Sequence, residues 1–140
     1  MNVLVKIITS LIIGVLIYQS QVQKNNSIEV TVEAVANNDG KIFLALYNSE
    51  TNFLEKSYKG TKSEIINNSC TITFEDIPSG VYAISVFHDE NNNGKMDTNF
   101  MGIPKEDYGC SNDANGFMGP PKWKDAKFEL KENKSITITL

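Results

Sequence analysis

The chain of 140 residues contains no arginine, and all 13 of its cationic side chains are lysine. Arginine is the side chain best suited to forming paired hydrogen bonds with phosphates and base edges. The chain is also mildly acidic, with a formal net charge of −4. Both features argue against a nucleic-acid-binding protein, and we expect no nucleic-acid partner.

Side chains that bind zinc and other soft metals are also few, because the chain has two cysteines and one histidine. The spacing of Cys70, His88 and Cys110 matches no common zinc pattern. Two cysteines in an exported protein can form a disulfide, but they can also remain separate thiols. The sequence leaves both possibilities open.

The motifs of a catalytic nucleophile are missing as well, because no G-x-S-x-G turn or equivalent occurs. His88 is followed by Asp89, with Ser111 and Cys110 further along, which superficially offers a base and a nucleophile. Adjacent residues of a strand point to opposite faces, however, so Asp89 would not orient His88 as a triad requires. We therefore predict that the protein is not an enzyme.

A hydrolase that uses His88 and the loop carboxylates Glu106 and Asp107 is retained as an alternative. Surface acids near a turn are more simply explained as ligands or solvated charges.

Long apolar runs are confined to the start of the chain. Lys6 precedes the run from Ile7 to Tyr18, a pattern typical of a secretory signal peptide. The run is shorter than the ~20 apolar residues of a membrane span. Cleavage after Ser20 would put the bulky Tyr18 at a position that prefers a small residue, so an uncleaved membrane anchor is the alternative.

Residues 1–24 are thus predicted to be a signal peptide or N-terminal anchor, and residues 25–140 a single domain. We expect an exported protein that is periplasmic, in the cell envelope or secreted. It would contact a membrane only through an uncleaved N-terminal segment.

No long segment has helical periodicity, and short β-like runs dominate instead. The expected strands are residues 27–36, 41–47, 70–74, 81–87, 126–130 and 135–140, with turns at 37–40, 77–80 and 132–134. We expect the first two strands to form a hairpin, and residues 50–56 to form a helical turn with Phe53 and Leu54 in the core. This pattern predicts an antiparallel β-sandwich of transthyretin-like or Ig-like type with one long loop from Asp89 to Asp125.

The segment at the start of that loop has the spacing of a calcium site. Oxygen-bearing residues stand at positions 1, 3, 5, 7 and 9, with Gly94 at position 6 to allow the sharp bend. The expected ligands are Asp89, Asn91, Asn93, the Lys95 backbone carbonyl and Asp97.

The loop departs from a helix-loop-helix site in two respects. A strand-like run precedes it, and position 12 is Phe100 in place of a bidentate glutamate. Further ligands would come from Glu106, Asp107 or Asp113. With two motif carboxylates, calcium should bind weakly, at ~0.1–1 mM. The alternative is an asparagine-rich turn without metal, because Asn and Asp stabilise turns through their own side chains.

Residues 82–109, together with 111–114, 119–121 and the leading strands, resemble the bacterial family called domain of unknown function 2141. The resemblance covers essentially the whole exported part. It implies an exported protein with a sandwich-like fold and no established activity. Cys110 stands where the family usually has an apolar aromatic residue, which argues against a required disulfide. Residues 74–82 also resemble the Pro-x-Gly-x-Tyr hairpin of transthyretin-like sandwiches, which implies architecture only.

These observations together predict an exported, non-catalytic β-sandwich with a binding or accessory role towards an unknown envelope or extracellular ligand. Tyr108, Phe117, Met118 and Trp123 are candidates for contact, because aromatics in loops can stack on ligands. The alternative is that Trp123 and Phe117 pack over one end of the sandwich.

Overall fold

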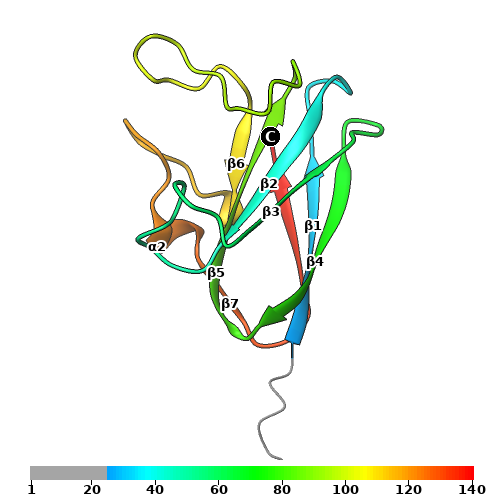
Figure 1. Cartoon of the computed structure of the whole chain (residues 1–140), viewed down its shortest axis with the longest axis vertical. Helices are drawn as coiled ribbons and strands as arrows, with labels where there is room; N and C mark the ends of the chain where they lie inside the picture. Colours follow the sequence, from blue (N-terminus) through cyan, green and yellow to red (C-terminus); the bar gives the residue numbers. More distant parts are fainter. Residues whose placement is uncertain (1–24) are drawn as a thin grey trace, which may run out of the picture.

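The computed structural model of the protein describes residues 25–140, and the predictions for the N-terminal segment lie outside these residues (Figure 1). The strands are β1 (Asn25–Glu33), β2 (Lys41–Tyr47), β3 (Lys59–Ser63), β4 (Cys70–Pro78), β5 (Gly80–Asp89), β6 (Tyr108–Cys110), β7 (Phe128–Leu130) and β8 (Lys134–Thr139). A 3-10 turn, η1 (Ser111–Asp113), and a short helix, α2 (Trp123–Ala126), complete the elements. No helix of the described part is long and apolar enough to cross a membrane.

The strands form two packed sheets, which confirms the predicted all-β sandwich. One sheet has the order β4-β1-β8, and the other has the order β3-β2-β5-β6, with β7 also paired to β5. All pairs are antiparallel except β1 with β8, which run parallel.

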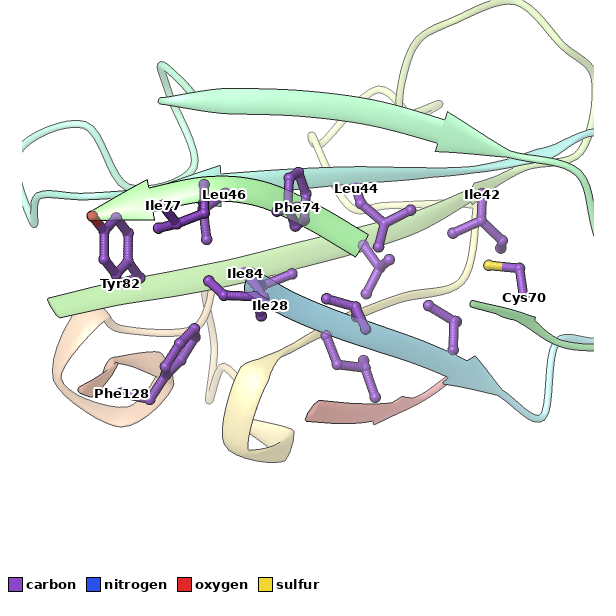
Figure 2. Packing of buried hydrophobic residues seen from close by; sticks show 14 of the residues in the cluster. Ile28, Ile42, Leu44, Leu46, Cys70, Phe74, Ile77, Tyr82, Ile84 and Phe128 are labelled. Atoms are coloured by element: carbon purple, nitrogen blue, oxygen red, sulfur yellow. The ribbon is translucent and has the colours of Figure 1, made fainter. Parts of the chain in front are cut away.

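The core lies between the sheets and follows from the alternation of side chains in the strands. Ile28, Val30 and Val32 of β1 are fully buried, and Ile42 and Leu46 of β2 face them from the other sheet (Figure 2). Complete burial of one such side chain stabilises the fold by about 1.5–3 kcal/mol.

The predicted hairpin of the first two strands is wrong, because β1 and β2 belong to different sheets. The connection between them crosses the end of the sandwich instead of turning back along it. Buried Val35 anchors this crossing, where its N–H donates to the Asn68 carbonyl at 3.1 Å and the Asn68 amide donates to the Val35 carbonyl at 2.7 Å. A turn signal fixes a change of direction but not the partner of the next strand.

Several element boundaries also differ from those predicted. Strands β3 and β6 were not predicted, because β3 is polar and β6 has three residues. Residues 50–56 form turns and no helix, with Phe53 half-buried and Leu54 exposed. The predicted strand 126–130 begins only at Phe128, because Ala126 belongs to α2.

A smaller cluster covers the outer face of β5. Ala83, Cys110, Ala114 and Ala126 are buried there. Trp123 and Phe53 pack over them with their rings in an edge-to-face arrangement at 5.7 Å. Both faces of the central strand β5 are therefore covered along part of its length.

We expect Gly40→Ala to destabilise the protein by about 2–4 kcal/mol, from left-handed strain and overpacking together. Gly40 has φ +69°, and an added Cβ would lie 1.9 Å from the Asp89 carbonyl oxygen. Gly102→Ala is the matched control, because Gly102 has φ +78° with open space around it, and should cost about 1 kcal/mol. Urea denaturation measures both, and equal losses would contradict the close approach of Gly40 to Asp89.

Candidate functional site

The loop that follows β5 begins at a buried carboxylate. Asp89 is fully buried, and its two oxygens accept hydrogen bonds from the backbone N–H groups of Asn93 at 3.1 Å and Gly94 at 2.8 Å. Gly94 has φ +76°, as the sharp bend requires. The side chain of Asp89 thus organises the turn from its inner side.

Two asparagines continue the turn by binding their own backbone. The Asn91 Oδ1 accepts the Asn93 N–H at 3.0 Å, and the Asn93 Oδ1 accepts the Lys95 N–H at 2.8 Å. These contacts are Asx turns, in which the side chain takes the place of a backbone acceptor. The oxygen atoms of alternate residues therefore face the inside of the loop.

The asparagine side chains also converge on Asp97. The Asn91 Nδ2 donates to one carboxylate oxygen of Asp97 at 2.6 Å, and the Asn93 Nδ2 donates to the other at 2.8 Å. Four of the predicted ligand side chains thus form one connected group, to which Lys95 is joined through its backbone N–H.

Of the three further carboxylates, Glu106 alone joins this group. Its Oε2 accepts the Asp97 N–H at 3.0 Å, whereas its Oε1 is buried without a hydrogen-bond partner in the described chain. Asp107 is exposed and contributes its backbone carbonyl to the His88 N–H. Asp113 lies in η1, which packs against β8 and α2.

A hard cation bound in this loop would need oxygen ligands other than carboxylates. Residues 25–140 contain no cluster of three or more His, Cys, Asp or Glu side chains suited to a metal, so an ion would depend on asparagine oxygens as well. The amide groups of Asn91 and Asn93 point their nitrogens at Asp97, so they would have to turn for their oxygens to bind. The unpartnered Oε1 of Glu106 provides an acceptor without a rearranged hydrogen bond.

His88 and Ser111, which the sequence offered as base and nucleophile, lie apart, and Asp107 of the hydrolase alternative meets the His88 N–H through its backbone carbonyl. His88 is fully buried, its Nε2 lies 2.6 Å from the Asp39 carbonyl, and its Nδ1 lies 3.7 Å from a Glu90 oxygen. The Ser111 hydroxyl is also buried, where it accepts the Ile84 N–H and donates to the Ala126 carbonyl. Ile84 and His88 are four residues apart on β5, or roughly 13 Å at ~3.3 Å per residue.

A large apolar groove lies beside the loop, on the outer face of the sheet that contains β2 and β5. Its volume is about 1310 Å³. Phe43 and Phe87 lie on its floor, with their rings stacked at 5.1 Å. The elements β6 and η1 divide the predicted long loop into two segments, and the name is kept for the segment between β5 and β6. One wall of the groove belongs to this long loop, at Met96 and at residues 101–104, and a second wall is formed by Gly116 and residues 118–121, between η1 and α2. Figure 1 shows the long loop reaching out from the end of the sandwich at which β5 ends.

Some of the predicted contact residues line this groove, and another packs beside it. Tyr108 and Met118 line the groove, and Phe117 is 93% exposed. Trp123 packs on Phe53, as the alternative prediction proposed for it, but the same alternative is wrong for the exposed Phe117. The aromatic floor of the groove was not predicted. A signal for it exists in the sequence, because β2 is apolar on both faces, which indicates that both faces are covered.

The two cysteines are free thiols in different parts of the fold. Cys70 lies on β4 in the main core, and Cys110 lies on β6 in the smaller cluster. Burial raises the pKa of the Cys110 thiol to about 11 and also raises the pKa of Cys70. Neither thiol is therefore activated as a nucleophile.

Residues 30–139 match the family described as uncharacterized proteins conserved in bacteria, DUF2141. The chain belongs to DUF2141. The match covers both sheets and the loop, and it confirms the family resemblance of the sequence. No match was found among curated proteins or solved structures. The geometry of this DUF2141 domain is thus the basis for any proposal about its function.

The free energy of unfolding should fall as the pH rises from 9 to about 11. The Cys110 pKa is raised from 9.0 to about 11, so the unfolded state loses its proton first and the folded state is disfavoured in this interval. The contribution of Cys110 amounts to about 2–3 kcal/mol, at 1.36 kcal/mol for each pH unit. Urea denaturation under reducing conditions should show a shallower fall for Cys110→Ala, and identical slopes would contradict burial of the thiol.

Proposed function

We propose that this protein is an exported, non-catalytic binding or accessory domain of the cell envelope, whose long loop is stabilised by a weakly bound calcium ion. The observation that carries the proposal is the convergence of Asp89, Asn91, Asn93 and Asp97 around the bend at Gly94. Calcium prefers such oxygen ligands and tolerates irregular geometry, whereas magnesium demands a rigid octahedron.

Electrostatics supports a cation in this loop. Asp89 is buried, and the backbone N–H of Asp97 binds Glu106, so three carboxylates belong to one hydrogen-bonded region. A divalent ion bound to this network would supply positive charge to its carboxylates. Lys95 is exposed and enters no ion pair of the described chain, which leaves the carboxylates without a cationic side-chain partner there.

The role of the ion would be structural and would extend to the groove. Met96 lies within the calcium loop and lines the groove, and residues 101–104 follow as the same wall. A backbone hydrogen bond from Lys105 to the Asp97 carbonyl, at 2.8 Å, closes this segment onto the loop. Fixing the loop thus fixes one wall of a binding surface.

The buried positions of His88 and Ser111 support a role without catalysis. Both side chains are engaged with backbone groups and are withdrawn from the groove. A ligand in the groove would meet neither of them.

Calcium should raise the melting temperature of the purified protein by about 5 °C. At ~1 mM calcium and a Kd of ~0.1 mM the stabilisation is about 1.4 kcal/mol, which corresponds to a shift of this size for a domain of this length. The measurement is thermal unfolding with chelator, then with calcium, then with magnesium. Magnesium should give a smaller shift.

Asp97→Asn should abolish the calcium shift, because it removes a ligand charge with little change of shape. Asp113→Asn is the matched control, since it removes the same charge in η1, and it should keep the shift. A shift that survives in Asp97→Asn, or no shift at 10 mM calcium, would reduce the loop to an asparagine-rich turn.

Export should leave a protein that begins near Gln21, because cleavage after Ser20 removes the apolar run from Ile7 to Tyr18. Mass spectrometry of the protein from the native cell would show the mass of this processed chain. A chain that retains the run would favour the alternative of an envelope protein anchored by its N-terminal segment.

A further inference from the structure

The groove on the outer face of the β2–β5 sheet has the size of a ligand site. At about 1310 Å³ it exceeds the ~300–1,000 Å³ of typical small-molecule pockets. Its floor is aromatic, and several apolar side chains at its edges are exposed, among them Met118 at 93% and Met101 at 65%. Exposed apolar side chains gathered around one groove mark a candidate binding surface.

The walls are unusually rich in methionine. Met96, Met101 and Met118 are all the methionines of residues 25–140, and each of them lines the groove. Methionine is unbranched and flexible, so a surface made of it adapts to an apolar partner without a fixed shape. Such walls suit a long flexible chain better than a rigid polar ligand.

The charge in the groove has one sign. The chain contains 17 acidic residues, and none of them lines the groove. Lys62 is the single charged side chain in the lining, and no ion pair of the described chain involves it. Its Nζ lies 5.9 Å from the centre of the Phe43 ring. In an acidic protein, this arrangement selects for an anionic group next to an apolar body.

The backbone of the floor has no free hydrogen-bonding groups to offer. Strand β2 is paired on one side with β3 and on the other with β5, and β5 is paired in turn with β6. A peptide lying across the floor could not satisfy its own N–H and C=O groups there, because only the edge strands β3 and β6 have a free side. A hydrocarbon chain has no such groups to satisfy.

We propose that the groove binds a free long-chain carboxylate of the fatty-acid type. The hydrocarbon chain lies over Phe43 and Phe87 between the methionine-bearing walls, and the carboxylate pairs with Lys62. This assignment rests on the binding role proposed above. Its two anchors, the aromatic floor and Lys62, belong to the strands, so it does not require that the loop be held by an ion.

The test uses the purified protein and 11-(dansylamino)undecanoic acid, with the neutral amide of the same compound as its partner. Fluorescence titration should give saturable binding of both, with the acid bound about fivefold more tightly, as expected for one partly exposed ion pair. Lys62→Met should remove this preference and leave the affinity for the amide unchanged. The titration is repeated with chelator and with calcium. Because the groove should bind the acid in both conditions, this comparison distinguishes an error in the calcium proposal from an error in the ligand proposal.

Lys134→Met is the matched control. Lys134 lies over the Phe128 ring at 6.0 Å, so it makes the same kind of contact away from the groove, and its loss should leave the fivefold preference intact. Ala45→Phe should fill the space above the floor and weaken the binding of both compounds at least tenfold. If Ala45→Phe does not fold, Met118→Asp serves instead, because that side chain is 93% exposed and an acid there should weaken the acid compound at least fivefold.

Equal affinity for the acid and the amide, or a preference that survives in Lys62→Met, would overturn the assignment. Unchanged binding in folded Ala45→Phe or in Met118→Asp would also overturn it, because the amphiphile would then bind elsewhere. Two further results would assign the groove to another occupant: binding of an apolar peptide but of neither amphiphile, or a dimer in sedimentation that Met118→Asp dissociates.

Discussion

The alternation of side chains along β5 is the constraint on which the core and both candidate sites depend. Tyr82, Ile84, Val86 and His88 point into the sandwich and are buried. The alternate residues face outwards, and three of them meet different structures: Ala83 lies under the smaller cluster, Phe87 lies on the floor of the groove, and Asp89 lies beneath the loop. A shift of one residue in the pairing of β5 with β2 would exchange the two faces and abolish all of these contacts at once.

The loop and the groove are connected through covalent continuity and a few backbone contacts. Asp89 ends β5 and organises the turn, and Met96 follows within eight residues as part of the groove wall. Gly40 lies directly against the Asp89 carbonyl, so the crossing between the sheets supports the same point from the other side. Order in the loop and the shape of the groove therefore depend on one another, whether the loop is held by hydrogen bonds alone or by an ion as well.

Local features of this chain could be predicted from the sequence, and non-local ones could not. The core positions of β1 and β2 follow from the period-two pattern, and the clustering of Asp89, Asn91, Asn93 and Asp97 follows from their spacing around Gly94. The partners of β1 are β4 and β8, which are remote in the sequence, so the nearby turn at 37–40 suggested the wrong pairing. Strand β3 carries little apolar signal because one of its faces is open to the groove and to solvent. The groove combines residues from Phe43 to Pro121, and no single window of the sequence contains it.

The placement of charge explains why the two candidate sites can coexist on one face of an acidic domain. Asp89, Asp97 and Glu106 belong to the inner side of the loop, where backbone N–H groups and asparagine amides surround them. The groove that begins at Met96 has no carboxylate and a single lysine. A carboxylate in the groove would repel an anionic ligand, and a lysine side chain paired with the loop carboxylates would compete with a cation. Lys95 belongs to the loop, but its side chain is exposed and enters no ion pair of the described chain. Only a few residues of one loop therefore separate the proposed cation site from the proposed anion site.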